Sequence, residues 1–208
     1  DGTHTFYVKA QNGSGLRSSA GSHQCQIDAT APGAPTNVDD GVSGWSSDNT
    51  PTFTWQHSGD TSGIDGYWWA IDDNTPETGG TWTTGTTATT GALSDGTHTF
   101  YVKAKNGSGL VGSYGSHQCQ IDTTAPEPNP AGWSIEPYAL GISSISMVAS
   151  EAMDEQQPGT EEYYFNELSG NSGGSDSSWQ SLTSYTDKGL VANTQYTYTV
   201  KYRDGLGN

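Results

Sequence analysis

The chain has 208 residues, of which 23 are acidic and 7 are basic, so its formal net charge at neutral pH is −16. This excess of carboxylates argues against a nucleic-acid-binding protein, because few cationic side chains are available to neutralise phosphates. Charged residues make up only 14% of the chain, glycine is abundant at 28 residues, and no long window has the apolar spacing of a helix. These features predict an all-β chain.

Residues 1–32 recur at 95–126 with five differences, at positions 11, 17, 18, 20 and 29, so the two copies are offset by 94 residues. A period of this length corresponds to one β-domain, and it predicts a tandem array of modules.

The first copy is expected to form two strands. Phe6 and Val8 alternate with polar neighbours, which is the period-2 pattern of a half-buried strand. The sequence Asn12-Gly-Ser-Gly predicts a turn, and a second strand follows around 23–28. The residues 29–35 contain two prolines and are expected to form a short, extended linker.

The complete module begins after this linker. Alternation predicts an edge strand near 37–43, a strand at 51–55 with Phe53 and Trp55 on one face, and a third strand at 64–71. In that third strand Tyr67 and Trp69 share the core face, whereas Trp68 points away from it. Short strands around Trp82 and 83–90, followed by the repeated hairpin, complete a two-sheet sandwich.

A second linker, 123–130, leads into a diverged third module with clear strands at 142–149, 161–165 and 194–202. The sequence Val200-Lys-Tyr-Arg-Asp-Gly-Leu-Gly aligns with Val102-Lys-Ala-Lys-Asn-Gly-Ser-Gly, so the chain stops within the final hairpin. We expect a fragment of a longer repeat protein.

The two cysteines, Cys25 and Cys119, occupy the same position in the two copies. Equivalent positions of tandem sandwiches lie much farther apart than the roughly 7 Å between Cα atoms that a disulfide tolerates, so we predict no bond between them. Each is expected to be a small buried hydrophobic residue.

The sequence resembles known repeat families in two places. Leu190-Val-Ala-Asn-Thr-Gln-Tyr196 resembles the fibronectin type III signature, with Tyr196 at the tyrosine-corner position, and Trp55 resembles the core tryptophan of that family. The phrases Asp95-Gly-Thr-His-Thr-Phe-Tyr-Val-Lys-Ala and Ile121-Asp-Thr-Thr-Ala-Pro resemble bacterial Ig-like repeats of surface adhesins and secreted enzymes.

The resemblance implies an all-β fold of tandem antiparallel β-sandwiches, Ig-like and fibronectin type III-like. Residues 1–32 would be the C-terminal hairpin of a truncated Ig-like module, and 33–126 a complete one. Residues 127–208 would be a fibronectin type III-like module that lacks its last strand.

The resemblance also implies a cofactor, because adhesin repeats of this kind hold calcium where consecutive domains meet. Asp28 and Asp122 match the terminal aspartate of those repeats. Calcium prefers six to eight oxygen ligands, which carboxylates and loop carbonyls can supply. The alternative is a solubilising aspartate at each strand end.

Three aromatic residues suggest a ligand surface. Trp68 and Tyr101 are expected to point outward from neighbouring strands, with Trp82 close by. Tryptophan and tyrosine combine an apolar face with a polar group, so these side chains are candidates to bind carbohydrate as an exposed, coplanar platform. The alternative is that another loop or module covers Trp68.

No sequence motif points to catalysis. His98 lies on the strand face of Phe100 and Val102, which favours a structural role, and Cys119 near His117 lacks the paired motifs typical of zinc sites. The chain has no nucleophile or phosphate-binding motif and no long insertion that would wall a cleft. The expected protein is not an enzyme.

Two functions remain open from the sequence. The first is a structural or adhesive segment, such as a stalk, filament or spacer, of a large extracellular or cell-surface bacterial protein. The second is a carbohydrate-binding accessory region of a secreted polysaccharide-degrading enzyme. Expected partners are neighbouring modules of the parent protein, polysaccharide, and a second chain through donation of the hairpin 1–28 to the unfinished third module, without nucleic acid or membrane insertion.

Overall fold

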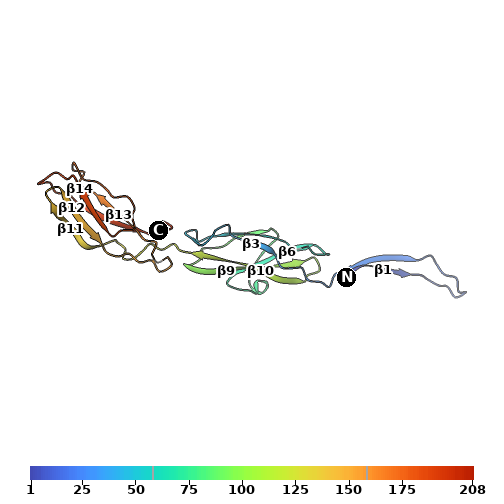
Figure 1. Cartoon of the computed structure of the whole chain (residues 1–208). Helices are drawn as coiled ribbons and strands as arrows, with labels where there is room; N and C mark the ends of the chain where they lie inside the picture. The colour runs from blue at the N-terminus through green and yellow to red at the C-terminus, as the bar shows by residue number, and fades with distance from the viewer. Residues whose placement is uncertain (58, 158) are drawn as a thin grey trace. The chain divides into compact units, whose positions relative to one another are not determined.

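The computed structural model describes residues 1–57, 59–157 and 159–208 (Figure 1). Within these ranges the only helical element is a single 3-10 turn, η1 (Pro76–Thr78), and all other regular structure is β-strand. The prediction of an all-β chain is therefore confirmed. No helix of the described part of the chain is long and apolar enough to cross a membrane.

The chain divides into two compact units. The first comprises Asp1–Val42, Thr50–Gly91 and His98–Cys119, and the second comprises Ser43–Asn49, Ala92–Thr97 and Gln120–Asn208. The predicted module boundaries near 32 and 126 stay predictions.

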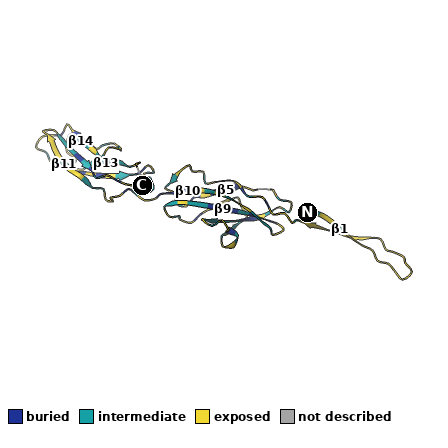
Figure 2. Cartoon of the chain, turned by 60° about the horizontal axis from the view of Figure 1, so that its bottom comes forward, coloured by how far each residue is buried: buried dark blue, intermediate teal, exposed yellow. Residues whose placement is uncertain are grey.

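The first copy of the repeat forms an antiparallel hairpin of β1 (Gly2–Val8) and β2 (Gly21–Ile27), in register from Gly2 opposite Ile27 to Val8 opposite Gly21. Both strands are largely exposed, as Figure 2 shows for β1. Cys25 is exposed, whereas Cys119 is buried, and both thiols are free. The prediction of a buried cysteine is confirmed for Cys119 and wrong for Cys25, because among the described residues no second sheet covers the hairpin of Cys25.

The complete sandwich consists of two sheets. One has the strand order β4-β10-β9-β6-β7 and the other β3-β5-β8. Their bounds are β3 (Thr36–Asp39), β4 (Trp45–Ser46), β5 (Thr52–Gln56), β6 (Ile64–Ile71), β7 (Thr81–Thr83), β8 (Thr87–Thr89), β9 (Gly96–Asn106) and β10 (Val111–Ile121).

Aromatic rings fill the space between these sheets. Phe53 of β5 stacks on Phe100 of β9 with ring centroids 4.2 Å apart, and Trp55 meets Tyr67 edge to face at 5.4 Å. The alternation of β5 and β6 puts these side chains on their inner faces, so the core prediction is confirmed for Phe53, Trp55 and Tyr67.

The third module also has two layers. One is the sheet β11-β12-β14, formed by Trp133–Gly141, Ser144–Ala149 and Ser184–Lys188, and the other is the pair β13 (Glu162–Glu167) and β15 (Tyr198–Arg203). A cluster that includes Met147, Tyr163 and Phe165 packs between them. The sequence patterns located β12, β13 and β15 but missed β11 and β14, whose residues are mostly exposed or half-buried and have weak alternation.

The tyrosine corner is present. The hydroxyl of Tyr196 accepts a hydrogen bond from the Val191 backbone N–H at 2.9 Å and donates one to the Ser172 carbonyl oxygen at 2.7 Å. Leu190, beside it, is buried. This geometry agrees with the resemblance of 190–196 to fibronectin type III domains.

Candidate functional site

Trp68 and Trp82 lie opposite each other on the neighbouring strands β6 and β7. Both side chains are half-buried, and their rings lie 5.0 Å apart between centroids at an angle of 59°. The expectation of coplanar rings is therefore wrong for this pair. Trp82 lies over Gly66, where a Cβ atom would come within 2.4 Å of its indole ring, so the missing side chain leaves room for the tilted ring.

Charged groups complete a pocket beside the two tryptophans. A cavity of about 410 Å³ is lined by Asp65, Trp68, Trp82, Thr84 and Lys105. The Lys105 ammonium lies 5.5 Å from the centre of the Trp82 ring, within the range of a cation–π contact, and 3.3 Å from Asp65 Oδ2. The pocket thus combines aromatic surface with a cation, a carboxylate and the Thr84 hydroxyl.

Tyr101 lies apart from this pair. It is opposite Ala70 on β6, and its ring contacts Tyr114 of β10 edge to face at 5.1 Å. Sequence reasoning missed Tyr114, whose side chain is exposed. A signal was available, because position 114 is one of the five that differ between the copies, with Ala20 as its counterpart.

His98 has a structural environment. Its Nδ1 lies 2.8 Å from Asp72 Oδ2, and the other carboxylate oxygen of Asp72 accepts a hydrogen bond from the Thr99 backbone N–H. Burial opposes ionisation of Asp72, but the bonds from His98 and Thr99 prevail and lower its pKa. These contacts join β9 to the residue that follows β6.

His117 faces carboxylates. Its Nε2 lies 3.3 Å from Asp40 and 3.8 Å from Asp39, in a group of three side chains that has the donor atoms to hold a metal ion. Burial raises the pKa of the Cys119 thiol, and the charge of Asp40 adds to this effect. A protonated thiol is a poor zinc ligand.

Each linker is fixed to the hairpin before it. Asp1 accepts hydrogen bonds from the Ala29 backbone N–H at 2.7 Å and from the Thr30 hydroxyl. Asp95 repeats this arrangement with the Thr123 N–H at 2.9 Å and the hydroxyl of the next threonine. The hydrogen bond from the Thr124 hydroxyl lowers the pKa of Asp95. The bonds from Thr123 lower it further, and burial acts in the opposite direction.

The first linker is also fixed to the residues that follow it. The side-chain amide of Asn106 donates to Asp28 Oδ2 at 3.1 Å, to the Thr30 carbonyl at 3.0 Å and to both oxygens of Asp60 at 3.3 Å. The amide oxygen of Asn106 accepts a bond from the Leu110 N–H, which fixes the orientation of the amide. Hydrogen bonds from Ser62 and Thr30 lower the pKa of Asp28.

The second linker has a different set of groups. Asp122 Oδ2 accepts a hydrogen bond from the Gln157 amide at 2.7 Å, and its carbonyl accepts one from the Asn208 amide at 2.9 Å. Asp122, Asp154 and Asp204 are all buried, and carboxylate oxygens of the three lie within 4.8 Å of one another. Burial, together with the charges of Asp154 and Asp204, raises the pKa of Asp122.

The two candidate calcium aspartates therefore differ in their surroundings. Asp204 takes the place in the third module that Asn106 has in the complete one. At the first linker the Asn106 amide donates to the carboxylates of Asp28 and Asp60. At the second, the carboxylates of Asp122, Asp154 and Asp204 lie close together. The oxygen-rich set at Asp122 fits a divalent cation, because hard cations prefer oxygen ligands. Without an ion, the Gln157 amide donates to Asp122, and backbone N–H groups donate to Asp154 and Asp204.

No family model matches the chain. Chitinase A1 of Niallia circulans is 32% identical over 185 residues, which is 88% of this chain and 25% of the chitinase, so the chain spans about a quarter of that relative. Two similar solved structures are the chicken CNTN1 FN1–FN3 domains and the central fibronectin-III array of RIM-binding protein.

The CNTN1 structure has a TM-score of 0.39 and 18% identity, covering 98% of this chain and 73% of that one. The RIM-binding protein structure has a TM-score of 0.34 and 14% identity, with coverage of 85% and 64%.

Proposed function

We propose that this chain is a non-catalytic repeat segment that acts as a spacer in an extracellular polysaccharide-degrading protein. The observation that carries the proposal is the way both linkers are tied by hydrogen bonds on their two sides. Asp1 and Asp95 bind the linkers from the preceding hairpin. From the residues that follow, Asn106 binds the first linker at Thr30, and Gln157 and Asn208 bind Asp122, which directly precedes the second linker.

Close backbone packing adds to these bonds at the first linker. A Cβ atom on Gly112 would come within 2.1 Å of the Pro32 carbonyl oxygen, and one on Gly115 within 2.2 Å of the Pro35 oxygen. The linker backbone thus lies directly on β10, which only glycine permits. Proline restricts the same residues further, so this linker has little freedom to bend.

The similarity to chitinase A1 supports the assignment to a polysaccharide-degrading parent and to the outside of the cell. The adhesive role that the sequence left open has no comparable support.

Amide hydrogen exchange tests the spacer. We expect the N–H groups of Ala29 and Thr123 to be protected in the intact chain, because each donates to a carboxylate. Asp95→Ala should release Thr123 alone, and Asp1→Ala, the matched control, should release Ala29 alone. Exchange of both amides at the rate of an unfolded chain in the unsubstituted protein would overturn the proposal.

A second candidate function is contact with polysaccharide at Trp68 and Trp82. It is favoured by the cavity beside these rings, where a sugar would meet both aromatic carbon and the Lys105–Asp65 pair. Tyr101 and Tyr114 form a separate aromatic pair on β9 and β10. Affinity electrophoresis against soluble glycans, with Trp68→Ala as the variant and Tyr7→Ala as an exposed aromatic control, tests this function.

The proposal includes calcium at the second linker, with Asp122, Asp154 and Asp204 as ligands, and leaves Asp28 as the weaker candidate. Ca²⁺ at one hundred times its dissociation constant would add about 2.7 kcal/mol of stability to the folded state. Thermal unfolding with Ca²⁺ or with a chelator measures this effect. An unchanged midpoint would remove calcium from the proposal and leave the spacer intact.

Self-association remains a separate proposal. The exposed Phe6 and Val8 of β1 correspond to Phe100 and Val102, which are buried in the complete sandwich, so the hairpin has a face suited to covering by a second chain. Sedimentation velocity over a range of protein concentrations tests it, and a monomer at all concentrations would contradict it.

A further inference from the structure

The outer face of the third module repeats the arrangement around Trp68 in different residues. Tyr164 of β13 lies opposite Lys201 of β15, just as Trp68 of β6 lies opposite Lys103 of β9. Two residues further along, Arg203 holds the place of Lys105 and lies opposite Glu162. No sequence motif indicates a ligand surface on this face.

A tryptophan completes the arrangement in each case. Trp179, from the segment between β13 and β14, lies 5.3 Å from Tyr164 between ring centroids at a tilt of 40°. Trp82 stands in the same relation to Trp68 at 5.0 Å and 59°. The Arg203 guanidinium lies 4.3 Å from the centre of the Trp179 ring, as the Lys105 ammonium lies over Trp82.

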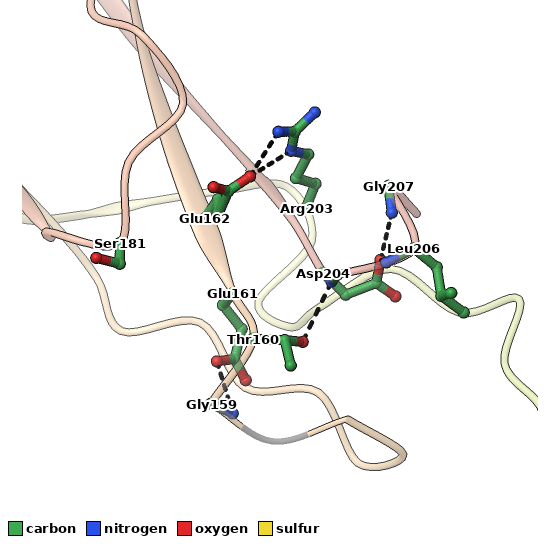
Figure 3. Close-up of a pocket in the computed structure, with 10 residues that line it drawn as sticks. Gly159, Thr160, Glu161, Glu162, Ser181, Arg203, Asp204, Leu206 and Gly207 are labelled. Atoms are coloured by element: carbon green, nitrogen blue, oxygen red, sulfur yellow. Dashed lines mark hydrogen bonds and ion pairs between the residues drawn. The ribbon is translucent and has the colours of Figure 1, made fainter. Parts of the chain in front are cut away.

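An acid holds the cation in both modules. Arg203 Nε and Nη2 donate to Glu162 Oε2 at 2.8 and 2.5 Å, and Figure 3 shows these two side chains facing each other at the edge of a cavity. That cavity has a volume of about 470 Å³ and is lined by polar groups that include Thr160, Glu161 and Asp204. The rings of Tyr164 and Trp179 lie beside the Arg203–Glu162 pair and are not part of the cavity lining. About a third of each side chain in the Arg203–Glu162 pair is exposed, so polar atoms remain available to a ligand.

We propose that Tyr164, Trp179, Arg203 and Glu162 form a second polysaccharide site, with the same chemistry as the site at Trp68 and Trp82. The inference rests on the second candidate function proposed above. A sugar ring would place its C–H groups on the uncovered part of the half-buried Tyr164 and Trp179 rings and its hydroxyl groups on the charged pair.

The charges favour an uncharged glycan. Each site contains one cation paired with one acid, while the chain as a whole carries a net charge of −16. Long-range repulsion therefore opposes polyanions, and neither site offers excess positive charge to overcome it. The occupant that fits is a neutral polysaccharide.

Two sites on one chain have a measurable consequence. Once one site holds a polymer, binding at the other becomes intramolecular and strengthens the overall attachment. Short oligosaccharides that fill only one site would lack this gain. If the aromatic rings only stabilised the sheet, the chain would not bind the polymer more tightly than short oligosaccharides.

The test is affinity electrophoresis of the full chain in gels containing glycol chitin or hydroxyethyl cellulose. The variants are Trp82→Ala, Trp179→Ala and the double variant, with Tyr138→Ala as control, because Tyr138 is an exposed aromatic residue of β11. We expect each single tryptophan variant to weaken apparent affinity for one of these polymers about tenfold or more. The double variant should abolish retardation, and the control should leave it unchanged.

Glu162→Gln is the variant that separates a loss of binding from a loss of folding, because it removes the charge while keeping the size of the side chain. We expect it to weaken retardation severalfold while the thermal midpoint stays within a few degrees. If Trp179→Ala and Glu162→Gln leave retardation unchanged while Trp82→Ala abolishes it, the second site is wrong and the first stands. If the unsubstituted chain is not retarded by either polymer, both binding proposals fail and the spacer remains.

Discussion

Phe100 and Phe6 occur in identical ten-residue sequences, yet the structure predicts opposite consequences of replacing them with alanine. Phe100 has no exposed surface and stacks on Phe53 at 4.2 Å, with Trp69 and Trp55 at 5.6 and 5.8 Å. Removing a phenylalanine from such an environment costs about 3–5 kcal/mol through lost burial and an unfilled cavity. The side chain of Phe6 is 67% exposed, so Phe6→Ala should cost about 0.5 kcal/mol or less.

The assay is thermal unfolding followed by near-ultraviolet circular dichroism, which reports packed aromatic side chains, here those of the complete sandwich and of the third module. The comparison concerns the transition of the complete sandwich. A loss of about 3 kcal/mol should lower its midpoint by about 12 °C or more, since about 4 °C accompanies each kcal/mol in a domain of this size. Phe6→Ala is the matched control, because its neighbours in sequence are the same. Equal effects of the two substitutions would refute the reasoning and show that the hairpin is covered in solution.

Three further outcomes are expected. At pH 7, Asn106→Asp should unfold at a lower temperature than Asn106→Ala, because it places a third carboxylate beside Asp28 and Asp60. The difference between the two unfolding midpoints should shrink as the pH falls and the carboxylates become protonated. A difference that does not change with pH would contradict this explanation. Gly112→Ala should lower the free energy of unfolding, measured by chemical denaturation, by about 1–3 kcal/mol, because the new Cβ would meet the Pro32 carbonyl oxygen. Gly91→Ala should lower it far less, because no atom lies near a Cβ at that position. Similar losses for the two variants would count against a packed linker. In a metal-free buffer, the free energy of unfolding should fall as the pH rises through the raised pKa of Asp122, because the folded state holds this proton more tightly than the unfolded chain. Asp122→Asn should make the free energy of unfolding less dependent on pH. If the pH dependence stays the same in this variant, it arises from other groups.

The linker contacts could be predicted only in part. The repeat indicated that Asp28 and Asp122 occupy equivalent strand ends, and the resemblance implied calcium at both. Their partners come from distant segments, since Asn106 reaches Asp28 across 78 residues and Gln157 reaches Asp122 across 35. Periodicity describes which face a side chain takes, but it does not identify a partner in another strand or turn.

The aromatic surface shows the same division. Alternation along 64–71 correctly placed Trp68 on the outer face of β6, because a strand sends successive side chains to opposite sides. The tilt of Trp82 depends on Gly66 in a neighbouring strand, and Trp179 comes from a segment without strand periodicity. These positions follow from packing between segments, so no local pattern could have indicated them.

By itself the sequence determined the repeat, the all-β class, the hairpins, and the inward and outward faces of the strongest strands, because each depends on residues close together along the chain. Which of those faces is buried depends on contacts between segments that are distant in the sequence. Cys25 and Cys119 lie in the same local sequence, yet the first is exposed and the second is buried. Burial requires a second layer of strands, and among the described residues that layer packs on β10 but not on β2.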